Sequence, residues 1–222
     1  MSYRDTTTLS TAGSSIEVNK VLRNTYFLLA MTLTFSAVAA GIAMAMNMSP
    51  VMSLVFFVAG FITLFIVNKK ADSASGIFWV FAFTGLMGAS LGPMLNHYAS
   101  LANGPALIMQ ALGGTALIFF SLSAYALTTR KDFSFMGGFL MVGLIVLLVA
   151  ALANIFLAIP ALSLTISAVI ILLMSALILF DTSRIIHGGE TNYIRATVGL
   201  YLNVFNIFVN LLQLLGVFGG DD

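Results

Sequence analysis

Uncharged apolar runs recur along almost the whole chain and are separated by short polar segments. Most reach the roughly 18 to 20 residues that an α-helix needs to cross the hydrocarbon core of a bilayer, and the second is slightly short. In hydrocarbon every backbone N–H and C=O must be paired within the protein, so such continuous runs predict helices rather than barrel strands. We expect seven membrane-spanning helices, at 24–46, 51–67, 77–95, 105–127, 135–159, 161–180 and 196–218.

Polar segments flank this apolar region at both ends. The first 23 residues are rich in Ser and Thr and contain no apolar core, which is typical of a flexible tail. Such a long polar lead does not suit a cleaved signal peptide. Because no soluble-sized insertion separates the apolar runs, we expect a tail at 1–23, a single transmembrane domain at 24–218 and a short C-terminal tail at 219–222.

The basic residues predict how the spans are oriented. If successive spans alternate in direction, every Lys and Arg falls on the same side of the membrane, and cytoplasmic loops are the ones enriched in these residues. We therefore expect a cytoplasmic N-terminus and, after seven crossings, a C-terminus on the opposite side. The residues concerned are Arg4, Lys20, Arg23, Lys69, Lys70, Arg130, Lys131, Arg184 and Arg195.

Composition excludes several classes of protein. Hydrophobic residues make up 60% of the chain and charged residues 8%, whereas soluble domains carry roughly 25% charged residues. The nine basic residues are too dispersed for a phosphate-binding patch, so we expect the lipid bilayer as a partner and no nucleic acid. Cysteine is absent, which removes disulfides, thiolate metal sites and thiol nucleophiles.

One carboxylate is expected within a span. Asp181 lies at the cytoplasmic end of the sixth apolar run, and ionisable groups at membrane depth are costly and therefore candidates for function. One interpretation pairs it with Arg184, three positions later on the same helical face. The other makes it an ion or proton gate at the inner mouth of a cavity between the helices.

The seventh run carries a stripe of amides. Asn203, Asn206, Asn210 and Gln213 follow one another at spacings of three, four and three, so they share one face of a helix. Amides facing lipid would lose their hydrogen-bonding partners, so this face must meet other helices or water. The last helix is therefore expected to be central or to line a cavity. Hydrogen bonding between helices and lining of an aqueous path both remain open.

Other residues predict packing rather than chemistry. Gly88 and Gly92 form a small-xxx-small face for close helix contact, and Pro93 is placed to kink the third span. His187 and Glu190 are three positions apart, but the glycines between them break a helix and two ligands make an incomplete site, so no metal is expected. Because no nucleophile has a base beside it, we expect neither an enzyme nor a cofactor.

The chain resembles the Bax inhibitor family of membrane proteins over nearly its whole length and, within that family, its bacterial YccA branch. The most specific matching segment is 187–198, and Phe180-Asp181-Thr182 resembles the acidic motif that ends the family's sixth helix. Further matching segments are Lys20 to Tyr26, Phe81 to Gly85, Leu91-Gly92-Pro93 and Leu127 to Asp132.

This resemblance implies a seven-helix bundle whose last helix is enclosed by the other six, in agreement with the amide stripe. It also implies two functions of different class. Some family members behave as pH-sensitive calcium leak channels, closed by a pair of aspartates that bridge helices six and seven. YccA-like proteins instead bind and restrain the membrane-anchored protease FtsH.

The sequence departs from the channel pattern at the second aspartate. Asp181 matches the first aspartate of the pair, but Asn203 stands at the second position, and an amide cannot share a proton as a second carboxyl does. Asp181 could accept a hydrogen bond from Asn203, or pair with Arg184 or a lysine that follows the second span. We therefore expect a bacterial inner-membrane regulator of an FtsH-type protease, with a calcium or other cation leak gated near Asp181 as the alternative.

Overall fold

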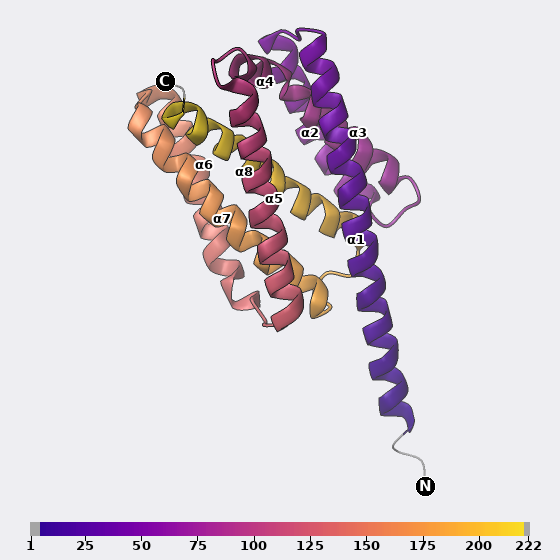
Figure 1. Ribbon diagram of the computed structural model, residues 1–222. Helices are drawn as coiled ribbons and strands as arrows, with labels where there is room; N and C mark the ends of the chain where they lie inside the picture. The colour runs from indigo at the N-terminus through magenta and orange to yellow at the C-terminus, as the bar shows by residue number, and fades with distance from the viewer. Residues whose placement is uncertain (1–4, 220–222) are drawn as a thin grey trace.

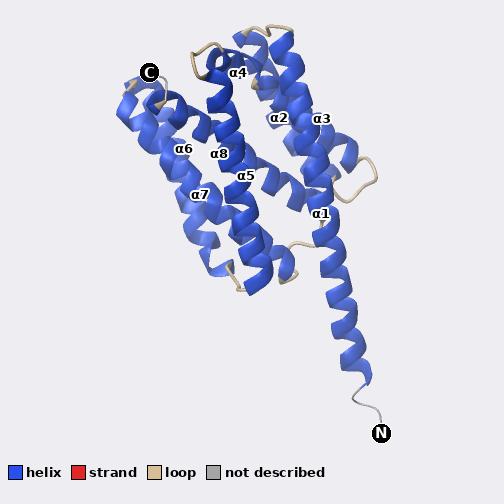
Figure 2. Cartoon of the chain, viewed as in Figure 1, coloured by secondary structure: helices blue, strands red, loops and turns tan. Residues whose placement is uncertain are grey.

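A computed structural model describes residues 5–219, with side chains from residue 16 onward, and this part of the chain forms helices joined by short loops (Figures 1 and 2). The helices are α1 (Asp5–Ala45), α2 (Pro50–Lys70), α3 (Gly76–Ser90), α4 (Gly92–Ala99), α5 (Gly104–Thr129), the short 3₁₀ helix η1 (Ser134–Met136), α6 (Gly137–Leu157), α7 (Pro160–Ile186) and α8 (Tyr193–Phe218). Prolines stand in the first turns of α2, α4, α5 and α7, where a fixed φ suits the helix and no N–H is needed.

Within the described residues, seven helical segments are long and apolar enough to cross a membrane, as the sequence predicts. The third span consists of α3 and α4, which are separated at Leu91. The Leu91 N–H bonds to the Gly88 carbonyl, at 3.0 Å, in a tightened turn just before Pro93, which has no N–H to continue the helix. The sequence predicts a kink at Pro93, and the structure has an interruption of the helix two residues earlier, at Leu91.

The first span differs from expectation at its beginning. The sequence predicts a flexible tail over 1–23, whereas the helical backbone of α1 runs without interruption from Asp5. Flexibility of the tail stays a prediction, and residues 1–4 lie outside the described part of the chain. Residues 220–222, most of the predicted C-terminal tail, also lie outside it.

The last helix is the central one. In Figure 1, α8 passes behind the space between α1 and α5, and it contacts α1, α2, α3, α5 and α7. Its side chains Leu200, Ile207 and Leu212 are completely buried. The resemblance implies enclosure by all six other spans, but α6 packs mainly on α7, so five of the six surround α8.

Two glycines bring α3 and α4 very close to α1. A Cβ atom at Gly88 would overlap the backbone and the hydroxyl of Ser36, and one at Gly92 would lie 2.7 Å from the Cβ of Ala43. The small-xxx-small face therefore packs against α1. This confirms the close packing that the sequence predicts and identifies the partner helix.

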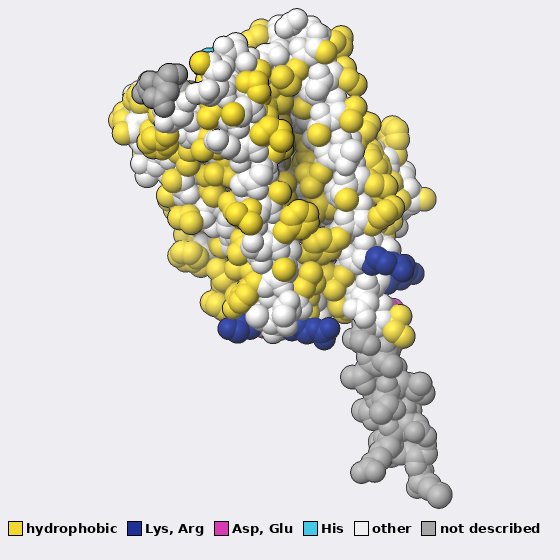
Figure 3. Space-filling model, in the orientation of Figure 1, with side chains coloured by type: hydrophobic (Ala, Val, Ile, Leu, Met, Phe, Trp, Pro, Cys, Tyr) yellow, Lys and Arg dark blue, Asp and Glu magenta, His cyan; other side chains and the backbone are white. Residues whose placement is uncertain are grey.

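The Lys and Arg side chains of the described residues lie towards one end of the bundle. Figure 3 shows Lys and Arg in the lower part of the molecule, below a surface that is mostly hydrophobic. The loops at this end join α2 to α3, α5 to η1 and α7 to α8. We call it the basic end; its residues are Lys69, Lys70, Arg130, Lys131, Arg184 and Arg195.

Candidate functional site

Asp181 lies between α7 and α8, next to the central helix. The Asn203 side-chain amide donates a hydrogen bond to Asp181 Oδ2 at 2.8 Å, and Asn203 is only 4% exposed. Gly199, one turn earlier on α8, leaves room for the carboxylate, because a Cβ there would lie 3.3 Å from Asp181 Oδ2. The structure thus contains one of the contacts that the sequence left open for Asp181.

Arg184 turns away from this contact. Its guanidinium lies 3.7 Å from Glu190 Oε2 and donates to the Gly189 carbonyl at 3.3 Å. It also lies over the Phe180 ring, 5.6 Å from the ring centre. Among the described ion pairs, Arg184 is joined to Glu190 and not to Asp181. The structure therefore brings together Asp181 and Asn203, and leaves Arg184 with the loop after α7.

The four amides of α8 have different environments. Asn203 bridges to α7, whereas Asn206 and Asn210 donate to carbonyls one turn back on their own helix, at 2.9 and 2.8 Å. Gln213 lines a small cavity of about 370 Å³ together with Asn154. Hydrogen bonding between helices therefore accounts for Asn203, and the role of the other three in lining an aqueous path stays a prediction.

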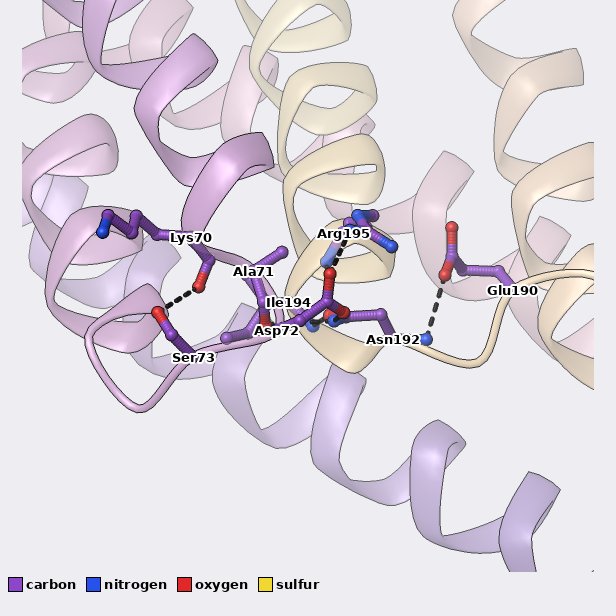
Figure 4. Close-up of polar contacts among 8 residues, drawn as sticks. All are labelled: Lys70, Ala71, Asp72, Ser73, Glu190, Asn192, Ile194 and Arg195. Carbon is purple, nitrogen blue, oxygen red and sulfur yellow. Dashed lines mark hydrogen bonds and ion pairs between the residues drawn. The ribbon is translucent and has the colours of Figure 1, made fainter.

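Asn192 joins two loops at the basic end (Figure 4). Its Oδ1 caps α8 by accepting the N–H groups of Ile194 and Arg195, at 2.9 and 3.2 Å. Its Nδ2 donates to the Ala71 carbonyl at 3.0 Å and to Asp72 Oδ1 at 2.7 Å. Arg195 adds an ion pair to Asp72 Oδ2 at 2.5 Å. The start of the central helix is thereby tied to the loop between α2 and α3.

Ser183, near the end of α7, makes a second connection at the basic end. Its Oγ accepts the Phe133 N–H at 3.0 Å and donates to the Lys131 carbonyl at 3.2 Å, which joins α7 to the segment after α5. In that segment, hydrogen bonding by the side chain and backbone of Ser134 lowers the pKa of Asp132 below its ordinary value. The loop from 187 to 192 is therefore flanked by fixed contacts on both sides.

His187 and Glu190 contact different partners and do not form a common site. His187 Nδ1 lies 2.9 Å from the Ser183 carbonyl, whereas Glu190 faces Arg184 and accepts the Asn192 N–H at 2.9 Å. Among the described side chains, no three His, Asp or Glu residues gather as a metal site would require. Sequence reasoning missed the role of Asn192, although an Asn just before an apolar run is an N-cap signal.

A larger cavity lies elsewhere, between α1 and α5. It has a volume of about 570 Å³ and α8 forms its floor; we call it the α1–α5 groove. At the floor, Ser36 Oγ and Tyr201 Oη are 2.7 Å apart and hydrogen-bond to each other. The groove does not include Asp181 or Asn203 among its lining residues, so it is a separate feature from the polar contact between α7 and α8.

Comparison with known proteins gives consistent matches over almost the full length. The model of the family described as "Inhibitor of apoptosis-promoting Bax1" matches residues 18–220. The Escherichia coli K12 protein named "Modulator of FtsH protease YccA" is 56% identical over 209 residues, covering 94% of each chain. An uncharacterized membrane protein of Vibrio cholerae is 54% identical over 97% of each chain, and an uncharacterized Pseudomonas aeruginosa protein is 50% identical over 96% of each.

Proposed function

Because this chain belongs to the Bax inhibitor family of membrane proteins, we propose that it binds and restrains a membrane-anchored protease of the FtsH type. The observation that carries the proposal is 56% identity, over 94% of both chains, to the protein named modulator of that protease. A similar Escherichia coli protein is named an inner membrane protein. The proposal includes a location in the bacterial inner membrane, an N-terminus in the cytoplasm, as the distribution of basic residues predicts, and a binding rather than an enzymatic role.

The proposed mechanism begins at the first helix. A protease that pulls on residues 1–23 from the cytoplasm would load α1 before any other span, because α1 follows directly. Gly88 and Gly92 let α3 and α4 lie against the α1 backbone at Ser36 and Ala43. Van der Waals attraction falls steeply with distance, so a small displacement of α1 from these neighbours would forfeit much of the contact.

Hydrogen bonds add to this attachment. The Ser36 hydroxyl bonds to Tyr201 of the central helix at 2.7 Å. Nearer the basic end, Thr197 Oγ1 lies 3.3 Å from the Thr25 carbonyl, although its shorter bond, at 2.7 Å, goes to the Tyr193 carbonyl on its own helix. The bond between Ser36 and Tyr201 would break if α1 slid past α8, and the Ser36 hydroxyl would need a new partner in a medium that offers none.

Removal of α1 from the bilayer is also costly in itself. Between residues 24 and 45 it carries nine large apolar side chains. Moving these from hydrocarbon to water costs on the order of 20 kcal/mol, at roughly 1.5 to 3 kcal/mol each. A substrate that the protease can grip but extracts only slowly occupies the enzyme and competes with other substrates. The polar composition of residues 1–23 supports the gripping step.

The test uses a purified FtsH-type protease, reconstituted with this protein and a second membrane substrate whose degradation is measured. Deletion of Ser2 to Ser15 should abolish inhibition of that degradation. As a matched control, a variant with residues 2–15 in scrambled order keeps length and composition and should still inhibit. Inhibition that persists after the deletion would contradict the mechanism. Inhibition lost in both variants would show that the protease recognises the order of residues 2–15, and that a polar end of the same length and composition is not enough.

A second candidate function is a cation leak, and the position of the Asp181 carboxylate between α7 and α8 favours it. The test is calcium efflux from proteoliposomes containing the wild type, Asp181→Asn or Asn203→Asp. A gate at this contact requires that Asp181→Asn changes the efflux and that Asn203→Asp, which provides two facing carboxyls, makes it more dependent on pH. Equal efflux from all three proteins across the pH range would reject such a gate.

A further inference from the structure

The α1–α5 groove is apolar and lies at the depth of the membrane. Its walls come from two helices that carry exposed hydrophobic side chains along their length, including Phe27 and Ile42 on α1 and Leu117 on α5. Figure 3 views this face of the molecule, where hydrophobic side chains border the space between the two helices. The medium beside such a groove is the interior of the bilayer.

The groove runs through most of the thickness of the hydrocarbon core. Tyr26 and Met44 both line it. The stretch of α1 between them is about 27 Å long at roughly 1.5 Å per residue, and the core of a typical bilayer is about 30 Å thick. The groove is therefore long and narrow, and it follows the direction in which lipid chains lie.

Its cross-section distinguishes between two apolar occupants. Dividing the volume of about 570 Å³ by this length gives a mean cross-section of about 20 Å². An α-helix with side chains is about 10–12 Å across and needs roughly 80–110 Å². A single polymethylene chain, whose carbons contact neighbours at about 3.5–4.0 Å, needs roughly 15–20 Å². The groove accommodates a hydrocarbon chain and is too narrow for a helix from another protein.

Water is a poor alternative occupant. The polar side chains that line the groove are already paired. Ser36 bonds to Tyr201, the Thr115 hydroxyl donates to the Ala111 carbonyl at 2.7 Å, and the Tyr26 hydroxyl bonds to that of Thr182 at 3.4 Å. A stable internal water needs two to four polar partners, so these residues offer little to hold one. An empty groove would forfeit dispersion contacts along its whole length. We propose that the α1–α5 groove binds an acyl chain of a membrane phospholipid, which lies against the central helix.

Small residues in the groove walls leave room for the chain. A Cβ atom added at Gly41 would meet no heavy atom within 4 Å, and Ala37 and Ala116 line the groove from opposite helices with exposed side chains. Gly41 lies five residues beyond Ser36, and Phe205 lies four beyond its bonding partner Tyr201. The two positions are therefore at similar depth, and a large side chain at 41 would cover the floor near Phe205.

The position of α8 provides a specific measurement. The protein is reconstituted in vesicles of phosphatidylethanolamine and phosphatidylglycerol, with a phosphatidylethanolamine analogue that carries a diazirine on its acyl chain. Surrounding lipid labels outer helices such as α6, whereas Val204, Phe205 and Phe208 on α8 line the groove floor. We expect labelling at 204–208 in the wild type. If label reaches α6 and not 204–208, no acyl chain occupies the groove and the proposal is wrong.

Two groove variants test whether the acyl chain reaches the α8 floor of the α1–α5 groove. Gly41→Phe should lower the ratio of α8 to α6 labelling at least fivefold. Gly113→Phe is the matched control, because Gly113 is exposed, has no heavy atom within 4 Å of an added Cβ and does not line the groove; its ratio should stay at the wild-type value. Ala116→Phe fills the groove from the α5 side and replaces Gly41→Phe if that variant does not fold. An unchanged ratio in the groove variants, or an equal loss in Gly113→Phe, would overturn the proposal.

Discussion

Replacing Gly88 with Ala tests the close approach between α1 and α3. The added methyl group would overlap the Ser36 backbone and its hydroxyl, not the movable end of a long side chain. Rotation of a side chain cannot relieve this overlap, so the two helices must move apart. Ser36 also bonds to Tyr201, and its displacement therefore disturbs a contact with the central helix as well.

The size of the effect follows from three contributions. Overpacking in a rigid site typically costs about 1–3 kcal/mol, and a backbone neighbour favours the upper part of that range. Weakening the hydrogen bond from Ser36 to Tyr201 adds about 0.5–1.5 kcal/mol. In the opposite direction, Ala is favoured over Gly inside a helix by about 0.5–1 kcal/mol. We expect Gly88→Ala to lower the free energy of unfolding by roughly 2–3 kcal/mol.

The assay is equilibrium unfolding in mixed micelles, with denaturing detergent as the variable. Gly113→Ala is the control, since an added Cβ at Gly113 meets no heavy atom within 4 Å. This control gains helix propensity without overlap and should be stabilised by up to about 1 kcal/mol. If both variants unfold at the same detergent fraction, α1 and α3 are not in the close contact described above, and the reasoning about resistance to extraction fails with it.

Two further predictions concern single polar contacts. Asn192→Ala removes the cap of α8 and its link to the loop after α2, and should lower the free energy of unfolding by about 1–2 kcal/mol. The control Asn68→Ala loses only an exposed bond to its own helix and should change the free energy of unfolding by less than about 0.5 kcal/mol in the same detergent titration. Asp181→Ala leaves the buried Asn203 amide without its acceptor and should lower the free energy of unfolding by about 1–3 kcal/mol, with partial recovery in Asp181→Ala/Asn203→Leu. Equal stability of the single and double variants would show that the amide finds another partner.

Much of the architecture could be predicted from local features of the sequence. The spans follow from the length of uncharged runs, because hydrocarbon tolerates little else at that length. The break before Pro93 follows from the missing N–H of proline. The central position of the last helix follows from its amides, since Asn203 and Asn210 are buried and could not have faced lipid.

Contacts between distant segments could not be predicted in the same way. Spacing on one helix suggested Arg184 as a partner for Asp181, and only the family resemblance pointed to Asn203 on another helix, which is the partner in the structure. Arg184 instead meets Glu190 in a loop whose path depends on how α7 ends. The α1–α5 groove depends on the separation of two helices that are far apart in the chain, and no pattern within either helix encodes that separation.

The central position of α8 has a consequence for how the protein is made. Synthesis proceeds from the N-terminus, so the helix that contacts five other spans leaves the ribosome after all five of them. Until α8 is inserted, the inward faces of those spans lack the helix that they pack against, and the Asp181 carboxylate lacks the hydrogen bond from the Asn203 amide. The bundle can therefore reach its native packing only after this helix has emerged. A chain interrupted before Tyr193 would present its unfilled interior to chaperones and to membrane proteases alike.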